Sequence, residues 1–428
     1  CGPTVYDFIH IGNARPLVVF DVLVRLLRII YPKVTYVRNI TDIDDKINKR
    51  AIEKKINISQ LTNETIKNFH KDAHALGNLK PDFEPKATDH ISEMIEMIET
   101  LISNGFAYFS SGNVLFAVEK YKNYGALSGR SLDEMISGSR VEVAEYKKNP
   151  GDFILWKPSS EKLPGWDSPW GRGRPGWHIE CSAMSKKYLG TQFDIHAGGL
   201  DLIFPHHENE IAQSCCANNS DIMANYWLHN GYVTSDGEKM SKSLGNFATI
   251  NSLLLNFRGE AIRYALMQAQ YRAPLNFSKK SLDEATKSLS RLYRAVEGFD
   301  VNDGQDTQII DNLCDDLNSP KALARLHYLA DEANKGSKEC AQKLKNSSNI
   351  LGILCNSTDE WFKFGEVNSN EAIENSTMTE KEIDELIIKR KIAKENKEYE
   401  KADQIREQLL EKNIQLEDKP DRTVWRRL

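Results

Sequence analysis

The spacing of apolar residues changes along this chain, and that change limits the folds the chain can form. Up to about residue 233, short apolar runs alternate with helical patterns; residues 20–27 have helical spacing, and Val34 to Ile40 forms a β-rich run. Strands that alternate with helices favour a parallel sheet joined by crossover helices. After Ser243 the patterns are helical, with no strands between them. The sequence therefore predicts an α/β domain followed by a helical part.

Shorter patterns divide the α/β part further. A helical pattern from Ile91 to Leu101 is followed by alternation from Ala107 to Val118 around Gly112-Asn113, which predicts a hairpin. Residues 120–176 are rich in Gly, Pro and Trp and lack a helical period. We expect these segments to form a β-containing insertion in the α/β unit.

The helical part also has subdivisions. Residues 281–355 predict a helical bundle, and the polar residues 357–380 predict a linker. A charged helix pair is expected around residues 389–411, for which a solvated surface is the ordinary interpretation.

Composition excludes several classes of protein. Of 428 residues, 40 % are hydrophobic and 27 % are charged, as in globular proteins with a sizeable core. Seven cysteines are too few for a disulfide scaffold, and no apolar run approaches the roughly 20 residues of a membrane span. A net charge of −5 excludes a wholly basic coat for nucleic acid, so any such contact must be local. We expect a cytoplasmic protein with free thiols and no membrane partner.

Two segments have features of phosphate binding. His10-Ile11-Gly12-Asn13 precedes a helical run; Asn13 is a suitable N-cap residue, the amides at the helix start favour an anion, and His10 could donate to a phosphate oxygen. An ordinary helix cap is the alternative. Lys239 to Asn246 places two lysines around small hydroxyl residues, which suits a mobile clamp on a polyphosphate. A solvated basic turn is the alternative there.

A third set of residues has the chemistry of zinc ligands. Cys1, Cys181 and the run from Pro205 to Glu210 offer thiolate, imidazole and carboxylate groups. On a helix, either His206 or His207 would share a face with Glu210, so spacing does not choose between the two histidines. The alternative is that both cysteines are small buried side chains and that a histidine caps the helix.

A glycine-rich segment lies within the second half of the α/β pattern. Asp194 to Asp201 follows a strand pattern and combines glycines with a carboxylate, as is needed where a ribose lies against the backbone of an α/β sheet. A tight turn with an Asp cap is equally compatible.

Together these residues resemble the class I aminoacyl-tRNA synthetases. His10 to Asn13 resembles the HIGH element of that class, with Asn13 in place of its last His, and Lys239 to Ser243 matches its KMSKS element letter for letter. Longer strings resemble the cysteinyl-tRNA synthetase family, and the resemblance runs from Cys1 to Arg427. These strings are Cys1 to Asp7, Asn39 to Lys46, Gly176 to Met184 and Phe204 to Glu210.

The resemblance implies a metal site and an amino-acid pocket. Carried over residue by residue, one zinc ion per chain would be held by Cys1, Cys181, His206 and Glu210. The zinc would bind the substrate thiolate and so reject serine without an editing domain. Gly2, Thr41 and Trp177 match positions in the amino-acid pocket.

It also implies the nucleotide chemistry. ATP, with Mg²⁺, would activate cysteine to cysteinyl-adenylate, and the terminal ribose of the tRNA would then take the cysteinyl group. No protein nucleophile is needed, so positioning and charge stabilisation supply the catalysis. The residues assigned to the reacting phosphates are His10, Gly12, Asn13, Lys239 and Lys242. Asp201 would bind the adenosine ribose.

For tRNA, the C-terminal segment resembles the small anticodon-binding domain of the family. Tyr399, Asp403 and Asp418 align with positions that contact unpaired bases by stacking and edge hydrogen bonds. Phosphate attraction would come from local clusters such as Lys389-Arg390-Lys391 and Arg426-Arg427. A monomer is expected, and because the first residue is Cys1 rather than Met, we also expect a strand ahead of it.

The fold class implied is α/β: a Rossmann-like parallel-sheet catalytic domain with an inserted β-containing connective segment, followed by a helical bundle and a small C-terminal anticodon-binding domain. The expected divisions are the two catalytic halves 1–90 and 176–235, the connective insertion 91–175, a stem-contact segment with the lysine loop 236–280, the helical bundle 281–365 and the anticodon-binding domain 378–428.

Two other functions are compatible with parts of this sequence. A relative that transfers cysteine from the same adenylate to an amino sugar would share the metal and nucleotide elements but lack this C-terminal segment. A non-catalytic paralogue would bind nucleotide or zinc as a regulatory module. It should have a broken lysine motif or lost metal ligands, and the sequence has neither.

Overall fold

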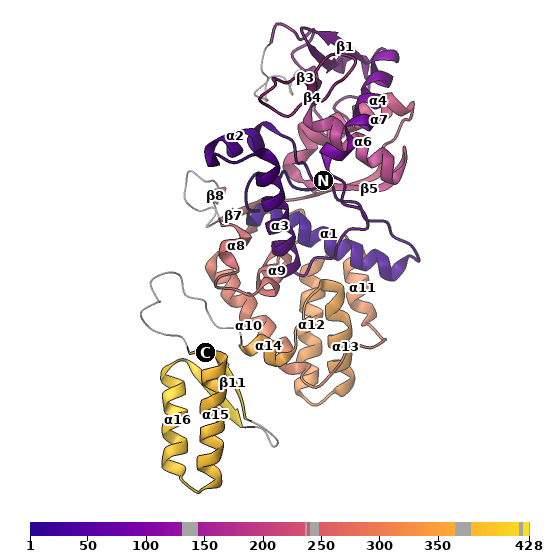
Figure 1. The fold of residues 1–428 in the computed structure, drawn as a ribbon. Coiled ribbons are helices and arrows are strands. Elements are labelled where there is room, and N and C mark those ends of the chain that lie inside the picture. Colours follow the sequence, from indigo (N-terminus) through magenta and orange to yellow (C-terminus); the bar gives the residue numbers. More distant parts are fainter. Residues whose placement is uncertain (131–143, 236–237, 240–247, 364–377, 419–422, 428) are drawn as a thin grey trace. The chain divides into compact units, whose positions relative to one another are not determined.

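A computed structural model describes the chain except residues 131–143, 236–237, 240–247, 364–377, 419–422 and 428 (Figure 1). The chain divides into two compact units. The first comprises Cys1–His74, Asn78–Phe247 and Ala269–Asn276, and the second Ala75–Gly77, Ala248–Gln268 and Phe277–Leu428. Among the described helices, none has the length and apolar character needed to cross a membrane.

The first unit is the predicted α/β part. Its helices are α1 (Ile11–Ile30), α2 (Asp45–Lys54), α3 (Ile58–Ala75), α4 (Ile91–Ser103), α6 (Trp177–Leu189) and α7 (Glu208–Asn218). Strands β5 (Phe193–Gly199) and β6 (Ala224–Asn230) pair in parallel, which confirms the expected strand direction. A second sheet has the order β8-β7-β9, formed by β7 (Val233–Ser235), β8 (Glu238–Lys239) and β9 (Leu275–Asn276).

The predicted insertion is an antiparallel sheet of four strands in sequence order. These are β1 (Ala107–Ser110), β2 (Asn113–Phe116), β3 (Phe153–Pro158) and β4 (Gly173–Pro175). The hairpin turn is Ser111-Gly112, and both residues have positive φ, as a two-residue type I′ turn requires. Met94 of α4, Phe116 of β2, Ile179 of α6 and Ala212 of α7 share one buried core. This core fixes α6 and α7, which carry much of the site described below.

The β-rich run from Val34 to Ile40 does not form a continuous strand. The structure has isolated parallel bridges from Val37 to Phe83 and from Ile40 to Lys86. The facing segment contains Pro81 and Pro85, and a proline has no N–H to donate to a ladder. The pairing is therefore interrupted although the residues of the run favour a strand.

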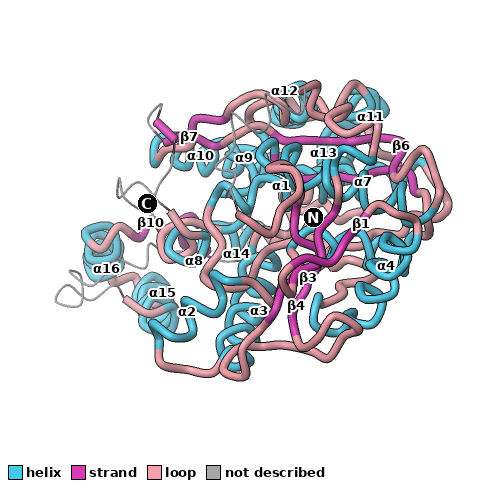
Figure 2. The backbone as a smooth tube through the Cα atoms, turned by 90° about the horizontal axis from the view of Figure 1, so that it is seen from above, coloured by secondary structure: helices cyan, strands magenta, loops and turns pink. Residues whose placement is uncertain are grey.

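The second unit is mainly helical, as predicted. Its helices are α8 (Ile250–Leu253), α9 (Gly259–Met267), α10 (Lys279–Ala295), α11 (Thr307–Cys314), α12 (Ser319–Asn334), α13 (Lys338–Ser348), α14 (Thr358–Lys363), α15 (Glu380–Glu395) and α16 (Tyr399–Glu411). Figures 1 and 2 show α15 and α16 side by side, the predicted charged helix pair. A hairpin of β10 (Ile414–Asp418) and β11 (Thr423–Arg427) follows; the sequence patterns did not indicate these strands.

The linker predicted at residues 357–380 is wrong in its first part, because α14 lies there. Trp361 is buried, stacks on Tyr293 with the ring centroids 4.7 Å apart, and donates from Nε1 to the Ser290 hydroxyl. A helix of 6 residues is too short for its period to be recognised among polar neighbours. Residues 364–377 of the expected linker lie outside the described residues.

Helix α3 contains a buried carboxyl group that should make stability depend on pH. Asp72 is 1 % exposed, and neither carboxylate oxygen has a hydrogen-bond partner among the described residues. Burial raises the pKa of Asp72 from 3.8 to about 6. In the unfolded chain this group ionises near pH 4, so its contribution to stability is full below pH 4 and is lost as the pH rises to 6.

We therefore expect Asp72→Asn to be more stable than the unchanged protein at pH 7, by up to about 3 kcal/mol, and to lose this advantage at pH 4. Urea unfolding of both proteins at the two pH values measures the difference. Asp283→Asn, at an exposed position on α10, is the matched control and should show no such dependence. Equal stability of D72N and the unchanged protein at pH 7 would contradict the expectation.

Candidate metal and nucleotide site

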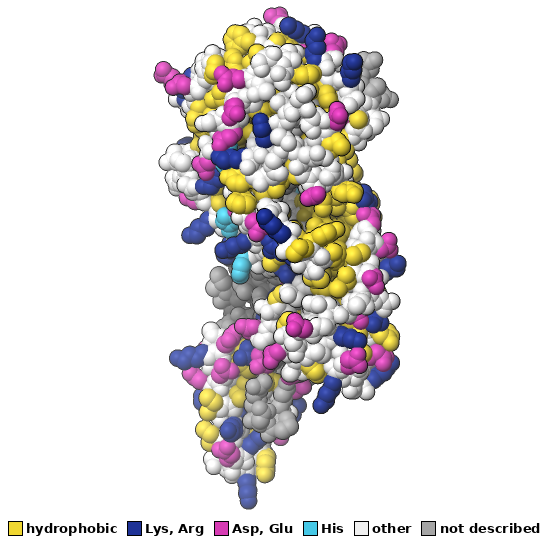
Figure 3. All heavy atoms as spheres, turned by 90° about the vertical axis from the view of Figure 1, so that its right-hand side faces the viewer, with side chains coloured by type: hydrophobic (Ala, Val, Ile, Leu, Met, Phe, Trp, Pro, Cys, Tyr) yellow, Lys and Arg dark blue, Asp and Glu magenta, His cyan; other side chains and the backbone are white. Residues whose placement is uncertain are grey.

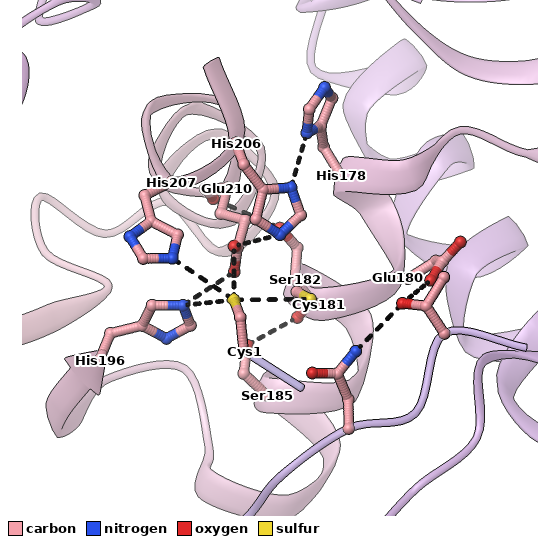
Figure 4. A network of polar contacts seen from close by, with 12 residues as sticks. Cys1, His178, Glu180, Cys181, Ser182, Ser185, His196, His206, His207 and Glu210 are labelled. Atoms are coloured by element: carbon pink, nitrogen blue, oxygen red, sulfur yellow. Dashed lines mark hydrogen bonds and ion pairs between the residues drawn. The ribbon is translucent and has the colours of Figure 1, made fainter. Parts of the chain in front are cut away.

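The four predicted metal ligands meet in the first unit (Figure 4). Cys1 comes from the first segment, Cys181 from α6, and Glu210 from the first turn of α7. His206 lies in the irregular turn Ile203–His207 that leads into α7. One ligand atom from each residue lies within 4.8 Å of the others. The fold thus brings together residues that are up to 209 positions apart.

The spacing of these atoms fits a single metal ion. The Sγ atoms of Cys1 and Cys181 are 4.0 Å apart, Cys1 Sγ is 3.5 Å from Glu210 Oε1, and His206 Nε2 is 3.0 Å from the same oxygen. Tetrahedral zinc with ordinary bond lengths separates its ligands by about 3.4 to 3.8 Å. Two sulfurs, one imidazole and one carboxylate are a donor set that suits zinc, and three of the four residues, Cys181, His206 and Glu210, are buried.

A second set of ligands overlaps the first. His196 Nε2 and His207 Nε2 each lie 3.4 Å from Cys1 Sγ, and His196 Nε2 is 3.3 Å from Glu210 Oε2. Cys1, His196, His207 and Glu210 could therefore also hold an ion. His196 is not among the metal ligands predicted from the sequence. The alternation of β5 could have indicated it, because His196 is a buried position of that strand.

Second histidines orient the candidate ligands. His206 Nδ1 is 2.8 Å from His178 Nδ1, and His207 Nδ1 is 2.8 Å from His229 Nε2. Burial lowers the pKa of His178 to about 3, so His178 is neutral and its Nδ1 can accept a hydrogen bond from His206 Nδ1–H. That hydrogen bond leaves His206 Nε2 to face the metal, as a partner behind a metal-bound histidine usually does.

Burial and neighbouring charges shift the pKa values of the buried site residues in different directions. Burial alone would raise the pKa of Glu210, but His196 and His206 lower it to about 2. Burial opposes the charged form of His206, and Glu210 and Cys181 outweigh that effect and raise the pKa of His206. The pKa of His207 is lowered well below its usual value by burial. Of the two adjacent histidines, His206 is the one held electrostatically by the carboxylate.

One cavity of 1340 Å³ is lined by two of the predicted metal ligands, Cys1 and Cys181, and by predicted nucleotide residues; His206 and Glu210 do not line it. Trp177 is 38 % exposed at this cavity and stacks on His206, with the ring centroids 4.1 Å apart. The predicted site residues that line the cavity are Cys1, Gly2, His10, Gly12, Asn13, Trp177, Cys181 and Asp201. Thr41 is buried, and its hydroxyl donates to Glu180 at 2.9 Å.

The helix start beside this cavity differs from the predicted one. His10, not Asn13, is the N-cap of α1: its Nδ1 accepts the Gly12 N–H at 3.1 Å, and Asn13 Oδ1 accepts the His10 N–H at 3.3 Å. This reciprocal pair moves the helix start three residues ahead of the expected position. It also places the proton of a neutral His10 on Nε2. A Cβ at Gly12 would lie 2.9 Å from the His10 ring, so a larger residue there would displace the capping side chain.

The lysine segment is only partly described. The backbone of Lys239 lies in β8, opposite Thr234 of β7, and Lys242 lies outside the described residues. Buried Arg15 of α1 donates to the carbonyl oxygens of Gly231 and Tyr232, just before β7. Burial lowers the pKa of Arg15 to about 10, so it stays charged at neutral pH. The helix that begins at the N-cap histidine therefore fixes the chain that leads to the lysines.

The predicted anticodon residues lie in the second unit. Tyr399 and Asp403 are exposed and four residues apart on α16, so they share a face. Asp418, at the end of β10, accepts two hydrogen bonds from Arg390 and one from Lys394, and these contacts lower its pKa. Figure 3 shows basic and acidic side chains interspersed on the face in view, in keeping with the net charge of −5.

Comparison with protein families gives two matches. Residues 1–287 match the family model described as the tRNA synthetases class I (C) catalytic domain, and residues 308–356 match the DALR domain. In known structures, the fold is similar to methionyl-tRNA synthetase of Mycobacterium tuberculosis, with a TM-score of 0.59 and 14 % identity over 82 % of this chain and 87 % of that chain. These matches confirm the expected fold class.

Similar sequences extend over the whole chain. Cysteine–tRNA ligase of Rhodospirillum rubrum is 51 % identical over 436 residues, covering 100 % of this chain and 94 % of the relative. That of Paramagnetospirillum magneticum is 53 % identical, with the same coverage of both chains. That of Pelagibacter ubique is 49 % identical and is covered to 93 %. With a catalytic-domain match over two thirds of its length and relatives about half identical from end to end, this chain belongs to the class I aminoacyl-tRNA synthetases and, within them, to the cysteine–tRNA ligases.

Proposed function

We propose that this protein activates cysteine with ATP to form cysteinyl-adenylate and transfers the cysteinyl group to the 3′ end of cysteine tRNA. The observation that carries the proposal is the single cavity shared by the thiolate-containing ligand cluster and the N-terminus of α1. Cysteine bound at the cluster and ATP bound at the helix would have their reacting groups in the same cavity. Membership of the cysteine–tRNA ligases supports the choice of amino acid.

Cys1, Cys181, His206 and Glu210 would hold one zinc ion. When bound, zinc supplies a Lewis acid that favours the thiolate of cysteine over the hydroxyl of serine. His178 keeps His206 in the tautomer that presents Nε2, and Trp177 packs over the His206 ring and covers it from the cavity. These residues would preorganise the site, so that selection between the two amino acids occurs without editing.

The helix start would act on the phosphates of ATP. In the activation step the cysteine carboxylate attacks the α-phosphorus, and the bond to pyrophosphate breaks. His10 can donate from Nε2 because its Nδ1 is occupied by the Gly12 amide. Lys239 and Lys242, with Mg²⁺ bound to ATP, would stabilise the negative charge on the leaving pyrophosphate. Asp201, at the edge of the cavity, would bind the ribose.

Binding of tRNA would use the second unit. We propose Tyr399, Asp403 and Asp418 as anticodon contacts and residues 378–428 as the domain that carries them. Exposure of Tyr399, at 62 %, supports base stacking by this side chain. Asp418 would contribute with its carboxylate already fixed by Arg390, so that its orientation is set before RNA binds. We propose that the protein acts as a cytoplasmic monomer with the division into domains given by its sequence.

The test is exchange of labelled pyrophosphate into ATP, followed by aminoacylation of cysteine tRNA. We expect exchange with cysteine, at least about 10³-fold less with serine, and loss of exchange after zinc is chelated. Cys314→Ser changes an exposed thiol on α11 and should keep both zinc and exchange. Absence of exchange from folded, zinc-loaded protein would refute the proposal. Exchange with transfer to an amino sugar but not to tRNA would favour the rival ligase.

A further inference from the structure

Three hydrogen bonds connect the segment of Cys1 with α6. The Gly2 N–H donates to Asn39 Oδ1 at 2.7 Å, and Asn39 Nδ2 donates to Thr41 Oγ1 at 3.4 Å. The Thr41 hydroxyl in turn donates to Glu180 Oε2 at 2.9 Å. We call Asn39, Thr41 and Glu180 the relay. Of these three residues, only Thr41 has a role predicted from the sequence.

The relay forms part of a ring that passes through the candidate metal site. Gly2 follows Cys1 in sequence, and Glu180 precedes Cys181. The two ends of the relay are therefore joined covalently to the two cysteines, whose Sγ atoms lie 4.0 Å apart. A metal ion bound by both sulfurs would complete the ring, so the lengths of the relay hydrogen bonds bear directly on the distance between the sulfurs.

The relay residues are buried, and backbone hydrogen bonds hold the segment of Thr41 beside that of Cys1. Asn39, Thr41 and Glu180 are 8 %, 1 % and 1 % exposed. The backbone reinforces the relay, because Thr41 N–H donates to the Pro3 carbonyl and its own carbonyl accepts from Val5 N–H. Hydrogen bonds in such surroundings strongly favour one arrangement, since a broken one leaves a buried polar group unpaired.

We propose that Asn39, Thr41 and Glu180 are positioning residues that set the separation of the Cys1 and Cys181 sulfurs and thereby the affinity and geometry of metal binding. The inference rests on the proposed metal site and adds a determinant outside the ligands. It gives a role to Glu180, the buried carboxylate next to Cys181 on α6. Glu180 Oε2 accepts from the Thr41 hydroxyl, which begins the connection to Cys1.

Thr41→Val tests the relay, because valine keeps the shape of threonine and removes the hydroxyl. We expect T41V in the full chain to bind Zn²⁺ about tenfold more weakly in competition with a chromophoric chelator. The visible absorption of Co²⁺-loaded protein should also change, since it reports the arrangement of sulfur ligands. T41S keeps the hydroxyl and should restore both signals. The KM for cysteine should rise more than the KM for ATP.

A second variant approaches the relay from its other end. Glu180→Met removes the acceptor and places an apolar chain of similar length in the buried position. E180M should weaken Zn²⁺ binding as T41V does. The double variant T41V/E180M should bind Zn²⁺ as tightly as the weaker-binding single variant, because both substitutions break the same connection. Additive losses would contradict a single relay.

The outcomes separate this inference from the proposed function. The relay alone would be overturned if folded T41V and E180M had the Zn²⁺ affinity and the Co²⁺ absorption of the unchanged protein. Failure of the unchanged protein to bind Zn²⁺ or Co²⁺ would overturn the metal site itself. If circular dichroism shows that T41V is unfolded, E180M decides the question with the same two readouts.

Discussion

Replacing His206 with alanine should weaken zinc binding at least about a hundredfold, whereas the same change at His207 should weaken it less than about tenfold. His206 belongs to the set that contains both sulfurs, and His178 orients it with Nε2 toward Glu210. His207 belongs to the set with one sulfur, and its Nδ1 is paired with His229. Cysteine-dependent pyrophosphate exchange should fall in parallel with zinc content.

The two variants control for each other, because the histidines are adjacent and both are buried. Zinc per chain after dialysis and the affinity from chelator competition are the measurements. A large loss of zinc affinity in H207A, with a small loss in H206A, would reverse the assignment of the ligands. It would identify Cys1, His196, His207 and Glu210 as the ligands and contradict the assignment made from family resemblance.

Gly2→Ala should reduce cysteine-dependent pyrophosphate exchange by at least about a hundredfold. A Cβ at Gly2 would lie 1.7 Å from the backbone oxygen of Asn39, and at that distance the backbone must move. Because Gly2 adjoins Cys1 and its amide binds Asn39, the displacement would reach a metal ligand and the cavity wall together. We expect zinc affinity and the KM for cysteine to be affected as well.

Gly105→Ala is the matched control for this variant. Gly105 follows α4 with φ of +79°, and no heavy atom among the described residues lies within 4 Å of a Cβ built there. The change should cost about 1 kcal/mol of stability and leave zinc binding intact. Ordinary exchange by G2A would show that the segment accommodates a methyl group, and would rule out the close approach as a requirement of the site.

An element of the fold could be predicted when the residues that determine it are close together in the sequence. Helices α1, α4 and α10 have long apolar periods, and the hairpin has a glycine turn, so their positions followed from the sequence. The N-cap of α1 was misplaced because histidine is an uncommon cap and Asn13 is a common one. The interrupted pairing of Val34 to Ile40 depends on prolines in a distant partner segment.

The site itself shows the same limit. The resemblance implied four metal ligands, and the structure brings them together. His196 joins the cluster only because β5 lies beside the other ligand-bearing segments in the fold. The roles of Asn39 and Glu180 depend on contacts 37 and 139 positions away along the chain. No spacing in the sequence indicates such pairs, because they arise when separate elements pack.

The separation of the ligands along the chain also has a consequence for biosynthesis. Cys1 and Cys181 are 180 positions apart, and Cys1 and Glu210 are 209 apart. A ribosome that adds about 5–20 residues per second makes Glu210 roughly 10–40 s after Cys1. The complete ligand set therefore exists only after most of the first unit has been synthesised. In a small zinc finger the ion drives folding, whereas the ion proposed for this cluster could bind only to a nearly complete first unit.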